Sequence, residues 1–277
     1  MSRWIAWSAF LLTACSASRT PDASVVLDSV PADSGYQMAP IPDGPMGASI
    51  RRGLAILVAT RDSLPGYVNN DLNCMSCHLD QGTRPNGLSL VGVYARFPQY
   101  NGRSAQVFNL EDRINGCFER SMNGKPLPHD DPAMRDMVAW MAHASRGVEV
   151  GDSVPGQGVP RPQVNVGDTV AGAEVWRTTC ASCHGMNGEG TPAAPPTWGP
   201  RSFNIGAGMA RLRTAAGFIR HNMPFDRPGS LTDSQAVNVA AYLVSRPRPD
   251  FAGKEDDWPL GGAPADVAYP VKSAATP

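Results

Sequence analysis

The chain has 277 residues and a formal net charge of −1, and charged residues make up 18% of it. This near-neutral balance argues against a nucleic-acid partner, because nucleic-acid binding usually needs a broadly basic surface. The length suffices for two domains of about 100 residues, each able to form one modest core.

Residues 1–15 resemble a secretory signal peptide with a lipobox. A charged start, residues 1–3, precedes an apolar run that is shorter than the roughly 20 residues of a membrane-spanning helix. Residues 12–15, Leu-Thr-Ala-Cys, resemble a lipobox, which predicts acylation of Cys15; the alternative is an ordinary signal peptide that removes Cys15. Residues 16–45 are rich in Ser, Ala, Pro and Asp and are expected to be a flexible tether. We therefore expect a periplasmic protein, lipid-anchored to a bacterial membrane, with Ser16 favouring the outer membrane.

Residues 46–147 are expected to form a first helical domain. Apolar residues recur at helical spacing over 48–60, and further helices are predicted over 106–122 and 132–144. Pro132 suits a first helical turn, with Asp130 or Asp131 as the N-cap. The methionines of the last helix repeat at helical spacing and are expected to pack in the core rather than to bind metal.

Two Cys-x-x-Cys-His motifs predict two covalently attached c-type haems. They comprise Cys74, Cys77 and His78 in the first half of the chain and Cys180, Cys183 and His184 in the second. Two thiols at this spacing can each add to one vinyl group of the same porphyrin, and the histidine becomes the proximal iron ligand. The motifs lie roughly a hundred residues apart, whereas a zinc ribbon brings its cysteine pairs within about 15 to 20 residues.

The second half of the chain is expected to repeat the organisation of the first. Residues 148–168 have the Pro/Gly composition of an interdomain linker, and residues 169–250 are expected to form the second domain. Helices are predicted over 171–179, 209–220 and 232–245, the last with Asp233 and Ser234 near its cap. Residues 251–277 are expected to be an irregular C-terminal tail.

Met223 is the preferred sixth ligand of the second haem. It lies in a Met-Pro turn before the last helix, and a thioether raises the reduction potential as an electron-transfer haem requires. His221 is the alternative.

The sixth ligand of the first haem is left open by the residues alone. No Met-Pro turn follows His78 before the helix at Pro132, and the corresponding region offers Cys117, Met122 and His129. A thiolate would lower the potential and place a nucleophile beside an electron sink, whereas Met122 or His129 would make an ordinary carrier. Basic residues gather around Cys117, namely Arg96, Arg103, Arg113, Arg120 and Lys125.

The order of helices and haem motifs in both halves resembles class I cytochrome c, which implies an all-α fold of two such domains. Residues 112–128, DRINGCFERSMNGKPLP, more specifically resemble the diheme thiosulfate dehydrogenases. This resemblance extends from about residue 48 to 246. It implies an enzyme that joins two thiosulfates into tetrathionate and passes electrons from a His/Cys-ligated haem to a His/Met-ligated haem and on to a cytochrome or other periplasmic acceptor.

Residue by residue, the resemblance makes His78 and Cys117 the ligands of the first iron, with His184 and Met223 at the second. It places Arg103, Arg113 and Ser121 at a pocket for the thiosulfate anion. Lys125 is a weaker candidate for this pocket than Arg103 and Arg113, because a planar guanidinium matches an oxyanion better than the point charge of an ammonium does. Some family members carry Lys before the ligating Met, and Asn222 stands there in this chain, so Lys-for-Met ligand switching is not expected.

Three other functions stay open at this stage. They are a tetrathionate reductase that uses the same chemistry in reverse, a noncatalytic diheme electron carrier, and a sulfur-oxidation cytochrome that acts on substrate held by a carrier protein. A second group of basic residues, with only Asp226 opposing it, predicts a docking face for an acidic acceptor near the second haem: Arg201, Arg211, Arg213, Arg220 and Arg227.

Overall fold

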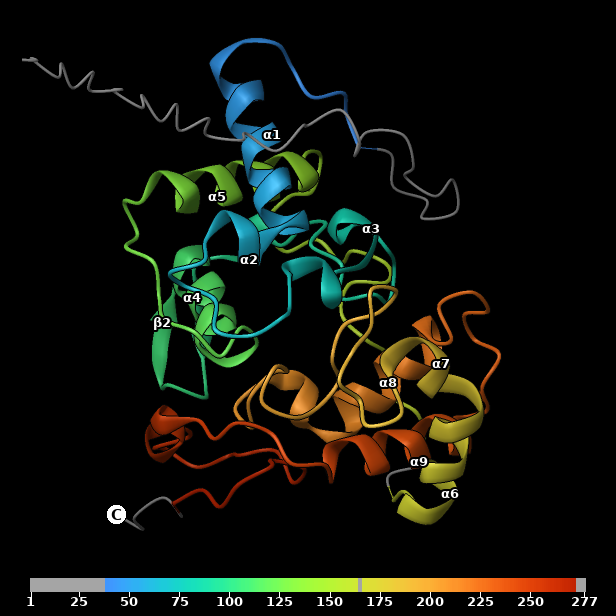
Figure 1. The fold of residues 1–277 in the computed structure, drawn as a ribbon. Coiled ribbons are helices and arrows are strands. Elements are labelled where there is room, and N and C mark those ends of the chain that lie inside the picture. Colours follow the sequence, from blue (N-terminus) through green and yellow to red (C-terminus); the bar gives the residue numbers. More distant parts are fainter. Residues whose placement is uncertain (1–37, 164–165, 273–277) are drawn as a thin grey trace, which may run out of the picture.

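The computed structural model describes residues 38–163 and 166–272. The predicted signal sequence, Cys15 and most of the tether lie outside these residues. Figure 1 shows the first domain, blue to green, above the second, yellow to red. Within the described ranges, no helix combines the length and the apolar content needed to cross a bilayer.

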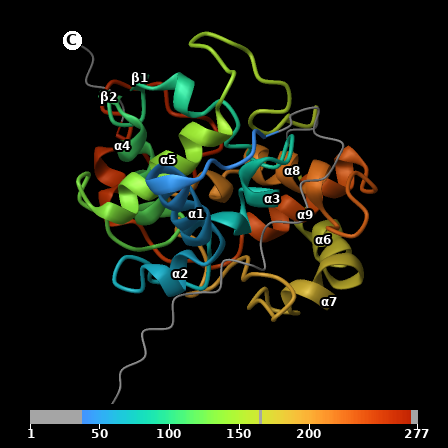
Figure 2. The ribbon, with the colours of Figure 1, turned by 90° about the horizontal axis from the view of Figure 1, so that it is seen from above.

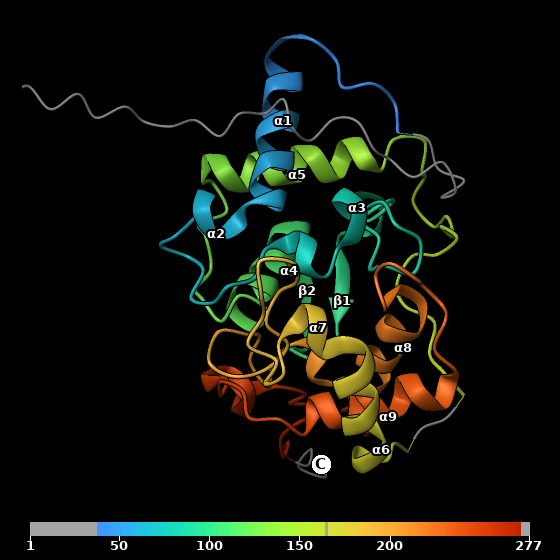
Figure 3. The same cartoon turned by 45° about the vertical axis from the view of Figure 1, so that its right-hand side comes forward.

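The first domain is built on helix α1 (Gly44–Val58), which crosses α5 (Pro132–Ala144) (Figure 3). The two backbones meet at Gly53, where an added Cβ would lie 2.0 Å from the carbonyl oxygen of Asp136. Asp131 caps α5, as predicted, by accepting a hydrogen bond of 2.8 Å from the backbone of Ala133. The methionines of α5 are buried in the core, as their spacing predicts.

Short elements connect these two helices. In chain order they are α2 (Thr60–Ser63), the 3-10 turn η2 (Cys74–Ser76), α3 (Leu79–Gly82), the 3-10 turn η3 (Tyr94–Arg96), strands β1 (Gln99–Asn101) and β2 (Gln106–Phe108), and α4 (Leu110–Arg120).

The helix predicted over 106–122 is shorter than expected. Its first residues form β2, which pairs antiparallel with β1 so that Tyr100 lies opposite Val107. Asn109 then begins α4, because its side chain accepts from the Asp112 amide at 2.9 Å and Asp112 in turn accepts from the Asn109 amide. This capping box sets the helix start. Apart from the small hairpin the fold is helical, as predicted.

The second domain repeats the helix crossing of the first. Its elements are α6 (Thr169–Val175), the π-helical turn η4 (Trp176–Cys180), α7 (Ala181–His184), the 3-10 turn η5 (Gly208–Ala210), α8 (Leu212–Asn222) and α9 (Asp233–Val244). Both α6 and α8 pack against α9, and Gly172 allows the close approach of α6, since an added Cβ would lie 2.0 Å from the Asn238 oxygen. The cap of α9 is Thr232, which accepts from the Gln235 amide, rather than Asp233 or Ser234.

Seen from above, the helices of the two domains lie side by side (Figure 2). The described part of the linker is held against the first domain, where the Gln157 side chain donates to the Val91 carbonyl at 2.8 Å. The tail has one 3-10 turn, η6 (Ala252–Asp256), and otherwise lacks regular structure up to residue 272. It passes beneath α4 and β2 (Figures 1 and 3), and the Trp258 amide donates to the Arg103 carbonyl at 2.6 Å.

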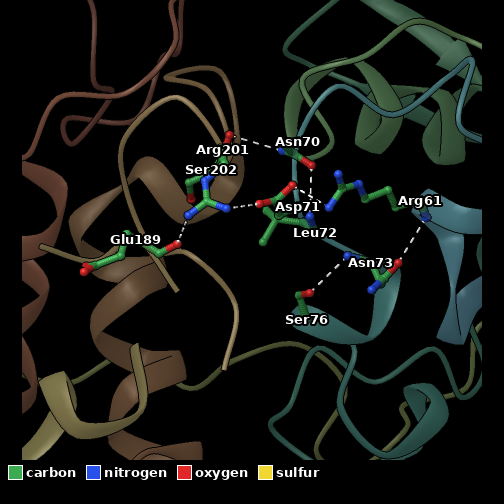
Figure 4. Close-up of polar contacts among 9 residues, drawn as sticks. All are labelled: Arg61, Asn70, Asp71, Leu72, Asn73, Ser76, Glu189, Arg201 and Ser202. Atoms are coloured by element: carbon green, nitrogen blue, oxygen red, sulfur yellow. Dashed lines mark hydrogen bonds and ion pairs between the residues drawn. The ribbon is translucent and has the colours of Figure 1, made fainter. Parts of the chain in front are cut away.

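A polar bridge joins the segment before the first haem motif to the second domain (Figure 4). Asp71 forms ion pairs of 2.6 Å with Arg61 and 2.7 Å with Arg201, and its amide donates to the Arg201 carbonyl at 3.0 Å. The buried Asn70 side chain donates to the Ser202 carbonyl at 3.1 Å. The first haem motif therefore begins at the domain interface.

Candidate active site and haem-attachment sites

The first Cys-x-x-Cys-His motif is fixed to α1 and α2 by Thr60. This threonine is fully buried, and its hydroxyl accepts from the Cys74 amide at 3.0 Å. The Nδ1 atom of His78 lies 2.6 Å from the Leu88 carbonyl, so Nδ1 carries the proton and Nε2 is left as the metal-binding nitrogen. The loop after the motif thus orients the histidine before any ligand binds.

An apolar pocket lies between this motif, α4 and α5. Its polar lining atoms are the sulfur and nitrogen donors of Cys74, Cys77, His78 and Cys117 together with Asn73 and Ser121, and its apolar lining is Leu72, Leu90, Ile114, Phe118, Met122, Met137 and Met141. Two thiols for attachment, an imidazole nitrogen and apolar walls are what a covalently bound haem requires, and the third thiol offers a second ligand for its iron. The residues of the pocket fit the group that the sequence predicts.

Cys117 differs in charge from the two attachment cysteines. Burial by itself raises the pKa of its thiol, but the positive charge of Arg113 and a hydrogen bond with His78 outweigh burial and lower that pKa to about 6. The Nη1 atom of Arg113 donates to the Cys117 sulfur at 3.1 Å. The thiolate is the form that binds metals and attacks sulfur.

The structure separates the three candidate ligands that the sequence left open. Cys117 and Met122 both line the pocket. His129 lies outside it: its side chain is half exposed, and Nε2 is 3.2 Å from the carboxylate of Asp112. Of the two residues in the pocket, Cys117 accepts a hydrogen bond from Arg113, and its assignment as the ligand stays a prediction.

The residues predicted for the anion pocket have different surroundings. Ser121, the C-cap residue of α4, lines the pocket one turn beyond Cys117. Arg113 is exposed at the pocket rim, while Arg103 is largely buried and donates from Nη1 to the Gly206 carbonyl at 2.7 Å. Lys125 is exposed, and its ammonium lies 5.2 Å from the centre of the Tyr67 ring.

The C-terminal end of α4 is capped by asparagines that sequence reasoning did not single out. Asn204, from the second domain, donates from its side chain to the Glu119 carbonyl at 2.9 Å and from its amide to the Arg120 carbonyl at 3.1 Å. Asn70 donates to the Ser121 carbonyl at 2.8 Å. The last carbonyls of a helix have no partner within the helix, so these bonds satisfy them. No local pattern links residues this far apart in the chain.

The second haem motif lies beside a cluster of aromatic rings. The Nδ1 atom of His184 lies 2.8 Å from the Pro195 carbonyl, which again leaves Nε2 for iron. The rings of Trp176 and Trp198 have centroids 4.4 Å apart, and Trp198 meets Tyr242 edge-on at 5.7 Å. Cys180 is half-buried and Cys183 is exposed. These residues supply the donors and the apolar wall of a second haem site.

Met223 packs against the apolar core directly after α8. The preceding residue, Asn222, is 1% exposed and donates to the Asn86 carbonyl of the first domain at 2.8 Å. His221 lies near the charges of Arg220 and Asp233, and burial and Arg220 lower its pKa. The assignment of Met223 rather than His221 to the second iron stays a prediction.

The second basic group is not the unopposed face that its sequence suggests. Arg201 pairs with Asp71, Arg220 with Asp233 at 2.7 Å, and Arg227 with Asp226 at 3.3 Å. The expectation that only Asp226 opposes these arginines is wrong, because Asp71 of the first domain and Asp233 of α9 also pair with them.

Two family models match the chain. Residues 68–150 match the SoxA/TsdA cytochrome c domain, and residues 167–243 match the model described as cytochrome c oxidase, cbb3-type, subunit III. Each match contains one of the two Cys-x-x-Cys-His motifs.

Relatives that match most of the chain include thiosulfate dehydrogenases. The thiosulfate dehydrogenase of Allochromatium vinosum is 43% identical over 255 residues, which cover 88% of this chain and 93% of that protein. That of Psychrobacter arcticus is 42% identical over 234 residues, 82% of this chain and 72% of that protein. Among solved structures, thiosulfate dehydrogenase (TsdBA) from Marichromatium purpuratum has a TM-score of 0.72 at 33% identity. The similarity covers 77% of this chain and 50% of that longer one.

Proposed function

Because this chain belongs to the diheme thiosulfate dehydrogenase family, we propose that it oxidises two thiosulfates to one tetrathionate. It is an oxidoreductase with two c-type haems. The observation that carries the proposal is the position of the Cys117 sulfur, which lines the pocket of the first haem motif and accepts a hydrogen bond of 3.1 Å from Nη1 of Arg113.

In the proposed site, His78 and Cys117 hold the first iron, and His184 and Met223 hold the second. When bound, the two haems supply two one-electron sinks and pass the electrons to an external acceptor, which accounts for two haems in a two-electron oxidation. The apolar walls of the pocket exclude water from the reacting sulfur atoms.

The proposed chemistry takes place on the Cys117 sulfur. This sulfur forms a bond with the sulfane sulfur of one thiosulfate, and the pair loses two electrons. The sulfane sulfur of a second thiosulfate then attacks that disulfide, which forms tetrathionate and returns Cys117 as a thiolate. Atoms and electrons balance, since two thiosulfates yield one tetrathionate and two electrons.

The arginines bring together substrates that repel each other. Two dianions 4 Å apart repel by about 4 kcal/mol even in bulk water. Arg113 at the rim and Arg103 beside α4 offset that repulsion, and a guanidinium fork matches the oxygens of the sulfonate group. Ser121, the C-cap residue of α4, provides a hydroxyl donor at the same pocket.

We also propose that the protein acts in the periplasm, anchored through Cys15. The lipobox-like sequence of residues 12–15 supports this location, as does covalent haem attachment at two sites.

The test is thiosulfate-dependent reduction of an artificial acceptor by the full holoprotein, with tetrathionate quantified. Cys117→Ala is expected to retain both haems but to lose more than 99% of the activity, whereas His129→Ala, outside the pocket, retains it. Full turnover by Cys117→Ala would refute the role of this sulfur. If the wild-type protein reduces tetrathionate from a reduced donor but does not oxidise thiosulfate, it is the reductase; if it does neither, it is an electron carrier.

A further inference from the structure

The C-terminal segment, residues 251–269, brings a buried carboxylate to Arg120 on the Cys117 helix and to Arg103. Asp257 is 4% exposed. Its two oxygens each accept a hydrogen bond of 2.8 Å from Arg120, and Oδ2 lies 3.7 Å from Nε of Arg103. The Tyr269 hydroxyl donates to the same carboxylate. Charge-assisted bonds from several donors hold such a carboxylate in one place.

Arg103 is fixed from further directions by the same segment and by the second domain. Its guanidinium lies 4.5 Å from the centre of the Trp258 ring, and its carbonyl accepts from the Trp258 amide at 2.6 Å. Its Nη1 atom donates to the Gly206 carbonyl at 2.7 Å. Within residues 38–163 and 166–272, no protein group accepts a hydrogen bond from Nη2. That edge of the guanidinium is available to an anion.

The charges explain why a carboxylate is needed at this position. Burial lowers the pKa of Arg103 to about 10, repulsion from Arg120 acts in the same direction, and Tyr269 and Asp257 oppose both. Without Asp257, the largely buried guanidinium groups of Arg103 and Arg120 would lack this carboxylate as a counter-ion. A long, flexible arginine side chain would then turn toward solvent, where its charge is hydrated.

The second arginine connects this carboxylate to the reacting cysteine. Arg120 is on α4, three residues after Cys117, and its guanidinium also lies 4.1 Å from the centre of the Phe251 ring. Its two hydrogen bonds to Asp257 therefore join the C-terminal segment to the helix that holds Cys117. Through the shared carboxylate, Arg103 has a fixed position relative to that helix.

We propose that Asp257 is a positioning residue of the anion pocket, which holds Arg103 against α4 so that the free edge of its guanidinium binds a thiosulfate dianion beside Cys117. The inference rests on the proposed function, because thiosulfate is the ligand of that site. Asp257 acts through Arg103 and does not contact the substrate. Its loss weakens thiosulfate binding and leaves the sulfur chemistry at Cys117 intact.

The experiment compares two Asp→Asn substitutions in the same segment of the full-length holoprotein. Asp257→Asn is expected to raise the KM for thiosulfate at least tenfold, with kcat within twofold and both haem spectra unchanged. Asp257→Glu restores most of the affinity. Asp250→Asn removes the same charge from an exposed carboxylate that pairs with Lys254, and it is expected to change KM by less than twofold.

A binding measurement without turnover separates affinity from catalysis. In the Cys117→Ala holoprotein, calorimetric titration with thiosulfate is expected to show binding at least tenfold weaker when Asp257→Asn is added, and unchanged when Asp250→Asn is added. If Asp257→Asn does not accumulate as holoprotein, Tyr269→Phe keeps the carboxylate and removes one donor to it. That variant is expected to raise KM about threefold.

The inference is overturned if KM and the dissociation constant of Asp257→Asn stay within twofold of the parent values, or if Asp250→Asn raises them equally. A loss of kcat with altered haem spectra and unchanged KM also overturns it, because Asp257 would then only support the domain. If Tyr269→Phe is the only variant that folds, an unchanged KM for thiosulfate in that variant also overturns the inference. The proposed function itself fails if the wild-type protein does not oxidise thiosulfate and the Cys117→Ala holoprotein does not bind it.

Discussion

Three cysteines line the first haem pocket, and their surroundings make them chemically different. Cys74 and Cys77 are predicted to form the thioether bonds of haem attachment, which leaves neither sulfur as a thiol. Cys117 is buried in the same pocket, but Arg113, four residues earlier on α4, donates to its sulfur and favours the anion. Arg113 lies one helical turn before Cys117, so α4 supplies both this sulfur and the guanidinium that donates to it.

His143 provides a residue-scale prediction about pH. It is 3% exposed on α5, and burial lowers its pKa below 6.5, an effect that the backbone of Ala39 only partly offsets. A histidine whose pKa is lowered by folding contributes stability that is present above its unfolded pKa and is lost as the pH falls through the folded value. The holoprotein is therefore expected to lose stability below about pH 6.5, in part because His143 must become charged.

Urea unfolding at pH 7.5 and pH 5.5 tests this expectation. His143→Leu should show a smaller drop in the free energy of unfolding between these pH values than the wild-type protein. His129→Leu, at a half-exposed position, serves as the control and should retain the wild-type difference. Equal differences in all three proteins would refute the role of His143.

At the scale of the element, α4 depends on both domains. Its N-terminus is set locally by the capping box of Asn109 and Asp112. Its C-terminal carbonyls are satisfied by Asn204 of the second domain and by Asn70. The helix that carries Arg113 and Cys117 is thus complete only when the two domains have docked.

Asn204→Ala is expected to destabilise the protein by about 1 to 3 kcal/mol, because it leaves the buried Glu119 carbonyl without its donor. Asn69→Ala is the matched control, since Asn69 is exposed and donates to the Met122 carbonyl through its backbone, which alanine retains. Chemical denaturation followed by haem absorbance measures both. A loss of stability of the same size in Asn69→Ala would contradict the assignment of Asn204 as the cap.

At the scale of the whole molecule, buried hydrogen bonds hold the domains together more strongly than the ion pairs do. The side chains of Arg61 and Arg201 are 55% and 58% exposed, so their pairs with Asp71 are worth about 0 to 1 kcal/mol each. Asn70 is 4% exposed and donates to carbonyls on both sides of the interface, those of Ser121 and Ser202. Asn70 therefore stabilises the domain interface more than its neighbour Asp71 does (Figure 4).

Asn70→Ala is accordingly expected to lower the free energy of unfolding by about 2 to 3 kcal/mol, because two buried carbonyls lose their donor. Asp71→Asn is expected to cost less than about 1 kcal/mol, and less still at high salt. Thermal unfolding monitored separately at the two haems should also show that Asn70→Ala separates their transitions. A larger effect of Asp71→Asn than of Asn70→Ala would reverse this ranking.

The sequence predicted the helical core of each domain closely. The helix over 132–144 and its Asp131 cap are found as predicted, because the proline, the cap and the apolar spacing act within one turn. The prediction was wrong at 106–108, where pairing with β1 outweighs helical periodicity, and at the cap of α9, which is Thr232.

By itself, the sequence determined the haem-attachment sites, the two helical domains and the family, because thioether attachment and helix formation depend on residues that are close along the chain. Only the tertiary structure decided that Cys117 and Met122, but not His129, line the first pocket. It alone also brought Asp257 to the arginines beside α4 and Asn204 to the end of that helix. The contacts of Asp257 and Asn204 join residues more than 80 positions apart. They depend on long-range packing and charge pairing, which leave no periodic pattern in a sequence.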